Sequence, residues 1–172
     1  MKIVRKMALL GIAGLLAAQT SAQTNGNMLQ LVQESYNHST LYEAIKSAEL
    51  ETMLTGKGPY TLFAPTNDAF THLPAGDWEE LKHSEKKRDL ADFINYHVVE
   101  GRYSEQDLRD AIRKGNGEAK LKTVSGGKLT FRLVDNTVVV TDAQGHDAAL
   151  NASDMTATNG VVYIVDSVFL KK

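Results

Sequence analysis

The chain contains no cysteine, only three prolines and little net charge among its 172 residues. Without cysteine there is no disulfide framework, no thiolate nucleophile and no thiolate-ligated zinc or iron–sulfur site. A formal net charge of -2 argues against a nucleic-acid-binding protein, which needs a basic face. The content of 42% hydrophobic and 23% charged residues is typical of one ordinary globular domain.

A hydrophobic run of membrane-spanning length is also missing. The apolar run from Met7 to Ala18 is shorter than the roughly 20 residues that a bilayer requires. Lys2, Arg5 and Lys6 precede it and small residues up to Ala22 follow it, an order that predicts a secretory signal peptide. We therefore expect a protein secreted to the periplasm or the cell exterior, without a membrane span. The predicted segments are a signal peptide at 1–22, a flexible N-terminus at 23–27 and one domain at 28–170.

Helical patterns dominate the first half of that domain. The first predicted helix has its apolar residues at helical spacing, namely Met28, Leu29, Leu31, Val32 and Tyr36. Further helices are predicted to begin at Ser39 or Thr40 and at Thr66, Asp77, Ser84 and Ser104, which are residue types that cap helices. Ser104 and Asp107 also have the spacing of a capping box.

Strand patterns dominate the second half. Short β-rich runs predict strands at 60–64, 98–99, 119–123, 129–133, 137–141 and 161–165, the last extended by Val168–Leu170. Helices followed by strands indicate the α+β class, with a β-sandwich or open barrel covered by helices.

Three segments carry a resemblance to the fasciclin domain family. They are Tyr60–Phe70, Asn95–Gly101 with its Tyr-His pair, and Asn159–Asp166. Their order and spacing match the family from about Met28 to Leu170. The resemblance implies a β-sandwich wedge covered by several α-helices, and a role in adhesion or binding at the cell exterior. It also assigns the signature residues Thr66, Asn67, Asp68, Phe70, Asn159 and Gly160 to structural motifs.

The same resemblance points to four binding candidates. Matrix members of the family are thought to bind integrins through the Tyr-His region, here Tyr96 and His97, and through a stretch before the last signature, here containing Asp154 and Met155. Only Asp154 is identical in that stretch. Each candidate has a structural alternative: His97 as a hydrogen-bonded buried imidazole, Tyr96 as a core ring, Asp154 as a turn cap and Met155 as a core filler.

No catalytic set can be assembled from the sequence. The remaining histidines lack the paired spacing of metal ligands, and no nucleophile elbow, phosphate-binding loop or dinucleotide fingerprint is present. We therefore expect no catalytic residues, no cofactor and no metal. The remaining histidines are His38, His72, His83 and His146.

Two functions remain open. The first is a non-enzymatic adhesion or interaction module that binds an extracellular protein or a surface polysaccharide. The alternative is a carrier of an apolar small molecule, such as a lipid or a pigment, held between helices and sheet. An apolar cleft open to solvent would favour the carrier, whereas a filled core beneath a polar surface would favour adhesion.

Overall fold

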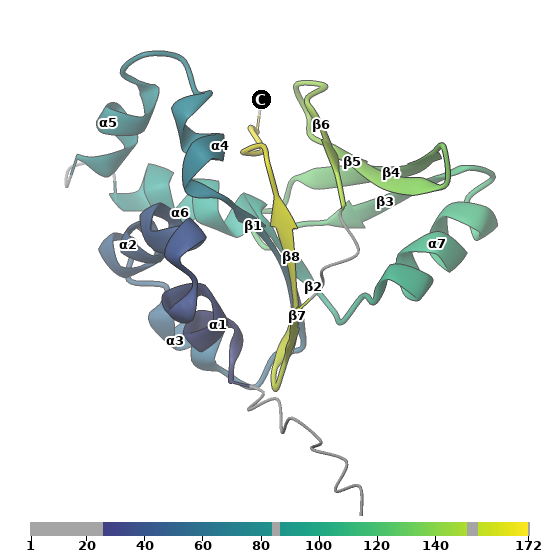
Figure 1. The fold of residues 1–172 in the computed structure, drawn as a ribbon, viewed down its shortest axis with the longest axis horizontal. Coiled ribbons are helices and arrows are strands. Elements are labelled where there is room, and N and C mark those ends of the chain that lie inside the picture. Colours follow the sequence, from purple (N-terminus) through teal and green to yellow (C-terminus); the bar gives the residue numbers. More distant parts are fainter. Residues whose placement is uncertain (1–25, 84–86, 151–154, 172) are drawn as a thin grey trace, which may run out of the picture.

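The computed structural model describes residues 26–83, 87–150 and 155–171. These residues form two four-stranded sheets and a set of short helices (Figure 1). The α-helices are α1 Met28–Glu34, α2 Ser39–Ser47, α3 Glu51–Thr55, α4 Asn67–Thr71, α5 Asp77–Lys82, α6 Lys87–Tyr96 and α7 Glu105–Lys114, with a 3-10 turn η1 at Tyr36–His38. Among the described residues, no helix combines the length and apolar character needed to cross a membrane.

The first sheet has the strand order β2-β1-β8-β7, and the second has the order β3-β4-β5-β6. The central strands β1 and β8 are parallel, with Tyr60 opposite Gly160 and Pro65 opposite Val165, whereas the other pairs are antiparallel. The strands are β1 Tyr60–Pro65, β2 Val98–Glu100, β3 Glu118–Lys122, β4 Lys128–Val134, β5 Thr137–Thr141, β6 Asp147–Ala149, β7 Met155–Ala157 and β8 Gly160–Val165.

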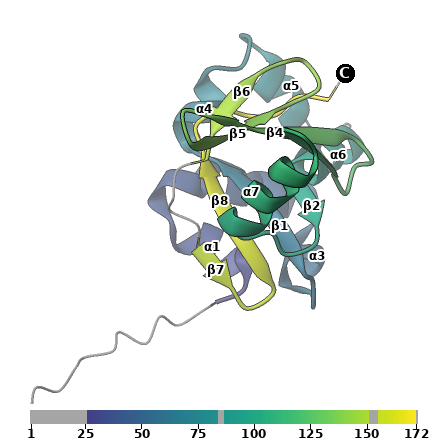
Figure 2. The same ribbon diagram turned by 90° about the vertical axis from the view of Figure 1, so that its right-hand side faces the viewer.

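The two sheets diverge like the faces of a wedge. Helices α1 to α6 lie on one side of the first sheet, while the second sheet and α7 lie on its other side (Figures 1 and 2). One hydrophobic core fills the space between the helices and the first sheet, and a second core fills the wedge between the sheets and α7. The predicted α+β wedge covered by helices is confirmed.

Local sequence explains several helix starts. The Thr66 hydroxyl accepts the N–H of Ala69 at 3.3 Å and so caps α4 directly after β1. Ser104 and Asp107 form the predicted capping box at the start of α7. The predicted cap at Ser84 lies outside the described residues.

The last signature joins the N-terminal helices to the first sheet. The Asn159 side chain is buried in the turn between β7 and β8, where its Oδ1 accepts the N–H of Met28 at 3.0 Å. Its Nδ2 donates to the carbonyls of Leu54 and Gly56, at 2.7 and 2.9 Å. The next residue, Gly160, leaves no room for a side chain, because a Cβ there would lie 2.0 Å from the carbonyl oxygen of Tyr60.

Two predictions about elements are wrong. Val168–Leu170 does not extend β8, which ends at Val165. The backbone N–H groups of Phe169 and Leu170 donate instead to the side chains of His97 and Asp142, so they cannot form a strand ladder. The three-residue strands β6 and β7 were not expected, because runs that short carry little periodicity.

The second wrong prediction concerns Tyr36, which does not belong to the apolar face of the first helix. Helix α1 ends at Glu34, and Ser35 has an extended backbone that breaks the helix. Tyr36 then opens η1, and its side chain is 96% exposed.

Candidate functional site

The Tyr-His pair lies at the end of α6, directly before β2, and both residues are buried. The His97 Nδ1 faces the carbonyl of Phe93 at 2.9 Å and must donate to it. The His97 Nε2 accepts the N–H of Phe169 at 2.8 Å. These partners fix the neutral tautomer with the proton on Nδ1. The imidazole ring also packs against the rings of Phe93 and Phe169, with centroids 4.9 and 5.2 Å away.

Burial makes the imidazole a weak base. It lowers the pKa of His97 from 6.5 to about 4, although the Phe93 carbonyl and the Asp142 carboxylate oppose this shift. His97 is therefore neutral near physiological pH. A neutral ring with both nitrogens engaged has no atom free for acid–base chemistry on a bound molecule.

Tyr96 connects α6 to the second sheet. Its hydroxyl donates to the carbonyl of Lys128 at the start of β4 and accepts the N–H of Ala143 beyond β5, both at 3.0 Å. Burial raises the pKa of the Tyr96 phenol, so the hydroxyl stays protonated and keeps both roles. The two adjacent residues thus connect α6 to the second sheet and to the C-terminal segment.

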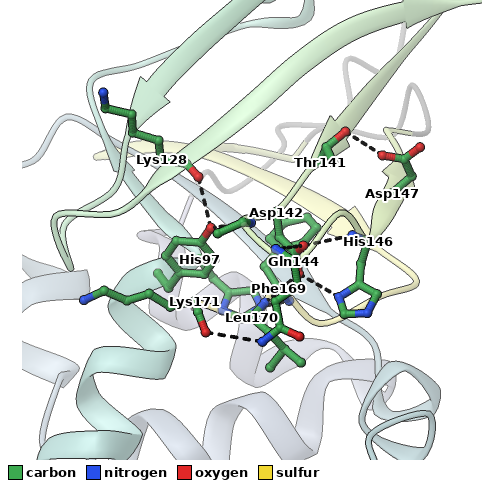
Figure 3. Close-up of polar contacts among 12 residues, drawn as sticks. His97, Lys128, Thr141, Asp142, Gln144, His146, Asp147, Phe169, Leu170 and Lys171 are labelled. Carbon is green, nitrogen blue, oxygen red and sulfur yellow. Dashed lines mark hydrogen bonds and ion pairs between the residues drawn. The ribbon is translucent and has the colours of Figure 1, made fainter.

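Asp142 is the centre of the neighbouring polar network (Figure 3), and the sequence analysis did not identify it. Its side chain is fully buried. Oδ1 accepts the N–H groups of Gln144 and His146, at 2.8 and 2.9 Å. Oδ2 accepts the N–H of Leu170 at 2.8 Å and contacts the Nδ1 of His146 at 2.9 Å. An aspartate three residues before a glycine, Gly145, is a pattern typical of a turn and was the signal that could have revealed this role.

The carboxylate of Asp142 stays ionised because donors surround it. Burial alone would raise its pKa, but the hydrogen bonds from Leu170, His146 and Gln144 outweigh burial and lower the pKa. Asp142 therefore holds the β5–β6 loop and the C-terminal segment together.

We expect Asp142→Asn to lower the free energy of unfolding by about 2 kcal/mol, because the new amide group would turn a donor toward N–H groups that need an acceptor. Urea unfolding monitored by circular dichroism measures this loss. The exposed Asp166→Asn is the matched control, and it should change stability by less than about 0.5 kcal/mol. Equal stability of both variants with the native chain would contradict the role assigned to Asp142.

The four binding candidates are not gathered into one surface. Tyr96 and His97 are fully buried and offer no atom to a partner, which favours their structural alternative. Met155 begins β7, at the edge of the first sheet farthest from β2, and its half-buried side chain packs against the helix-side core. Asp154 lies outside the described residues. Binding through any of the four stays a prediction.

Two adjoining clefts lie between helices α4 and α5 and the C-terminal segment, and they share Leu73 and Leu170. Their volumes are about 280 and about 320 Å³, at the low end of the range for ligand pockets. The first cleft carries two imidazoles on its rim, from His72 and His146. Within the described ranges, no group of three or more histidine, aspartate or glutamate side chains could hold a metal ion.

Comparisons with known proteins point to one family. A family model for the fasciclin domain matches residues 36–171. The chain is 37% identical over 154 residues to Protein sll1483 of Synechocystis, a match that covers 90% of this chain and 77% of that protein. It is 34% identical over 144 residues to the rabbit transforming growth factor-beta-induced protein ig-h3, which covers 84% of this chain but 19% of that protein.

A solved structure has the same fold. It is a FAS1 domain pair from the insect cell adhesion molecule Fasciclin I, which superimposes with a TM-score of 0.72 at 16% sequence identity. The match covers 85% of this chain and 51% of that chain.

Proposed function

Since this chain belongs to the fasciclin domain family, we propose that it is a secreted, non-enzymatic adhesion module that binds an extracellular protein or a surface polysaccharide. The name of the solved relative, an insect cell adhesion molecule, supports this proposal. The chain spans about a fifth of ig-h3, so the partners of a longer relative do not transfer to it directly. Recognition then depends on the surface of this one domain.

The observation that supports surface recognition most directly is the packing on both sides of the first sheet. The two cores consist of closely packed buried side chains, and the clefts described above are surface openings beside the helix-side core that are lined by polar as well as apolar groups. A carrier of a lipid or a pigment would need a larger apolar cavity. The described residues therefore favour adhesion over transport of an apolar molecule.

The catalytic alternative has little support from the same geometry. His97 is the histidine that the sequence marks most clearly, and its ring is sealed in the core with both nitrogens bonded. His146 is half-exposed but contacts the buried Asp142, and no nucleophile is paired with it in any hydrogen bond of the described residues. The proposed module acts by surface complementarity.

Secretion of the full-length chain from its host, followed by a cell-attachment assay, tests the proposal. We expect the secreted protein to begin at Gln23 and to attach saturably to cell exteriors or to their extracellular material. Heat-unfolded protein is the control for nonspecific sticking. Attachment that is equal for folded and unfolded protein would overturn the proposal, as would a stoichiometric lipid or pigment found by mass spectrometry of the purified protein.

A further inference from the structure

The two adjoining clefts form one groove with an apolar floor. The C-terminal segment after β8 lies beside α4 (Figure 1), and the groove is bounded by this segment and by the helices from α4 to α6. Leu73 and Leu170 line both clefts, and Leu81 lines the second one. All three leucines are half-buried against the helix-side core, so each keeps part of its apolar surface accessible. We call this feature the leucine groove.

The second cleft of the leucine groove is negatively charged. The exposed residues Asp77 and Glu80 of α5 and Asp89 of α6 line it together with the leucines. None of the described residues that line either cleft is a lysine or an arginine. Among the described residues, no ion pair neutralises Asp77 or Asp89. Carboxylates beside a low-dielectric apolar floor attract a cationic group.

The two lysines that directly follow groove leucines are held elsewhere. In the C-terminal segment, the Nζ of Lys171 pairs with the carboxylate of Asp92 on α6 at 3.0 Å. At the end of α5, the Nζ of Lys82 pairs with the carboxylate of Glu79 at 2.7 Å. The groove therefore keeps its negative charge for a cation that comes from outside.

An apolar floor beside carboxylates disfavours most classes of occupant. Nucleic acids, anionic membranes and acidic polysaccharides are repelled by the carboxylates. A lipid or a pigment leaves the carboxylates unmatched, and a small cation leaves the leucines unmatched. A polypeptide segment carries apolar and cationic side chains on one backbone. Gln144 and Ser167 in the first cleft add amide and hydroxyl groups that can bond to such a backbone.

We propose that the leucine groove docks a basic, apolar segment of an extracellular partner protein. An apolar side chain of the partner packs on Leu73 and Leu170. The aliphatic stem of a neighbouring lysine or arginine lies along the same floor, while its charged end reaches Asp77 and Asp89. This inference rests on the proposed adhesion function and selects a protein, rather than a polysaccharide, as its partner.

A fluorescence titration of the full chain tests the groove. Trp78 is the single tryptophan of the chain, and it is half-buried on α5 next to Asp77, so its emission reports an occupied groove. The probes are three short synthetic peptides that alternate leucine with lysine, leucine with glutamate, and serine with lysine. We expect saturable binding of the leucine–lysine peptide alone, weakened by about 0.5 M sodium chloride because salt screens exposed charges.

The charge contribution is tested by a double variant, Asp77→Asn with Asp89→Asn, which should bind the leucine–lysine peptide about tenfold more weakly. The matched control, Glu118→Gln with Asp135→Asn, removes the same charge from exposed positions of the second sheet and should bind like the native chain. Asp77 and Asp89 also lie in the first turns of α5 and α6, where a carboxylate stabilises a helix. The titrations are therefore run well below the melting temperature of each variant.

The apolar contribution is tested by Leu170→Ala, which shortens a side chain that both clefts share. We expect binding about fivefold weaker, because less apolar surface is buried on docking. Leu133→Ala shortens an exposed leucine on β4 and should bind like the native chain. If Leu170→Ala does not fold, the double charge variant still decides the proposal.

The inference is overturned if the leucine–lysine peptide does not bind, if the leucine–glutamate or serine–lysine peptide binds equally well, or if the groove variants bind like their controls. A peptide of residues 2–18 of this chain, with its basic start and apolar run, is the competing occupant. If it binds more tightly than the leucine–lysine peptide, the groove belongs to the chain's own N-terminus and the inference fails. If the native protein still attaches to cells under these outcomes, the adhesion function stands and only the assignment of its partner is wrong.

Discussion

His97→Ala is expected to lower the free energy of unfolding by about 3–5 kcal/mol. The substitution leaves two buried groups without partners, the carbonyl of Phe93 and the N–H of Phe169. Each unpaired group costs about 1–3 kcal/mol. It also removes a ring that packs between Phe93 and Phe169, and so opens a cavity in the core.

Urea unfolding of the variant measures this loss, and the exposed His72→Ala is the matched control, with an expected change under about 0.5 kcal/mol. If His97→Ala is too unstable to purify, the yield of soluble protein beside that of His72→Ala gives the same comparison. Native stability of His97→Ala would show that the structural role is wrong. If His97→Ala keeps the native stability but no longer attaches to cells, His97 takes part in binding the partner.

Acid is expected to remove about 3 kcal/mol of stability through the same imidazole as the pH falls from 6.5 to 4. The pKa of His97 is about 4 in the folded protein and 6.5 when the ring is free. Between these values the unfolded chain binds a proton that the folded chain does not, so protonation favours unfolding. The contribution is complete above pH 6.5 and is lost as the pH falls toward 4.

Two other groups act in the same direction. Burial lowers the pKa of His38, so its protonation in acid also favours the unfolded chain. The lowered pKa of Asp142 gives a stability that is present above its ordinary value of 3.8 and is lost as the pH falls further. The whole protein should therefore lose stability continuously below about pH 6.5.

Urea unfolding at a series of pH values between 7 and 4 measures the effect, and an NMR titration of the His97 ring assigns it. We expect the ring to stay neutral, with its proton on Nδ1, until the pH approaches 4. A His97 ring that titrates near pH 6.5, or a stability that is flat from pH 6.5 to 4.5, would contradict the expectation.

The sequence was most informative where the structure depends on close neighbours. The caps at Thr66 and Ser104 could be predicted because each cap and its partner lie three residues apart. The longer strands that line the two cores, such as β1, β4, β5 and β8, could be predicted because their apolar runs are continuous or alternate clearly.

Sequence patterns failed where a residue is defined by a distant partner. Asn159 reads as a simple turn residue, yet its side chain bonds to Met28, far away in the sequence. No local pattern indicates that the His97 side chain accepts the N–H of Phe169. This hydrogen bond takes the backbone N–H of Phe169 away from a strand ladder, and β8 ends at Val165. Tyr36 has the spacing of a core residue, but the extended backbone of Ser35 and the anchor from the distant Asn67 place it on a separate turn.

The parallel pairing of β1 with β8 has a consequence for how the chain folds. The strand that begins at Tyr60 pairs with β2 along one edge, but its parallel partner along the other edge is the strand that begins at Gly160, near the opposite end of the domain. While the ribosome is still adding the last strand, the early helices have no complete sheet to pack against, and their apolar faces stay open to chaperones or to aggregation. Pairing between such distant segments also slows folding. The chain therefore reaches its native state after synthesis of the domain is nearly finished, and loss of the final strand would leave the first half of the molecule without its central partner.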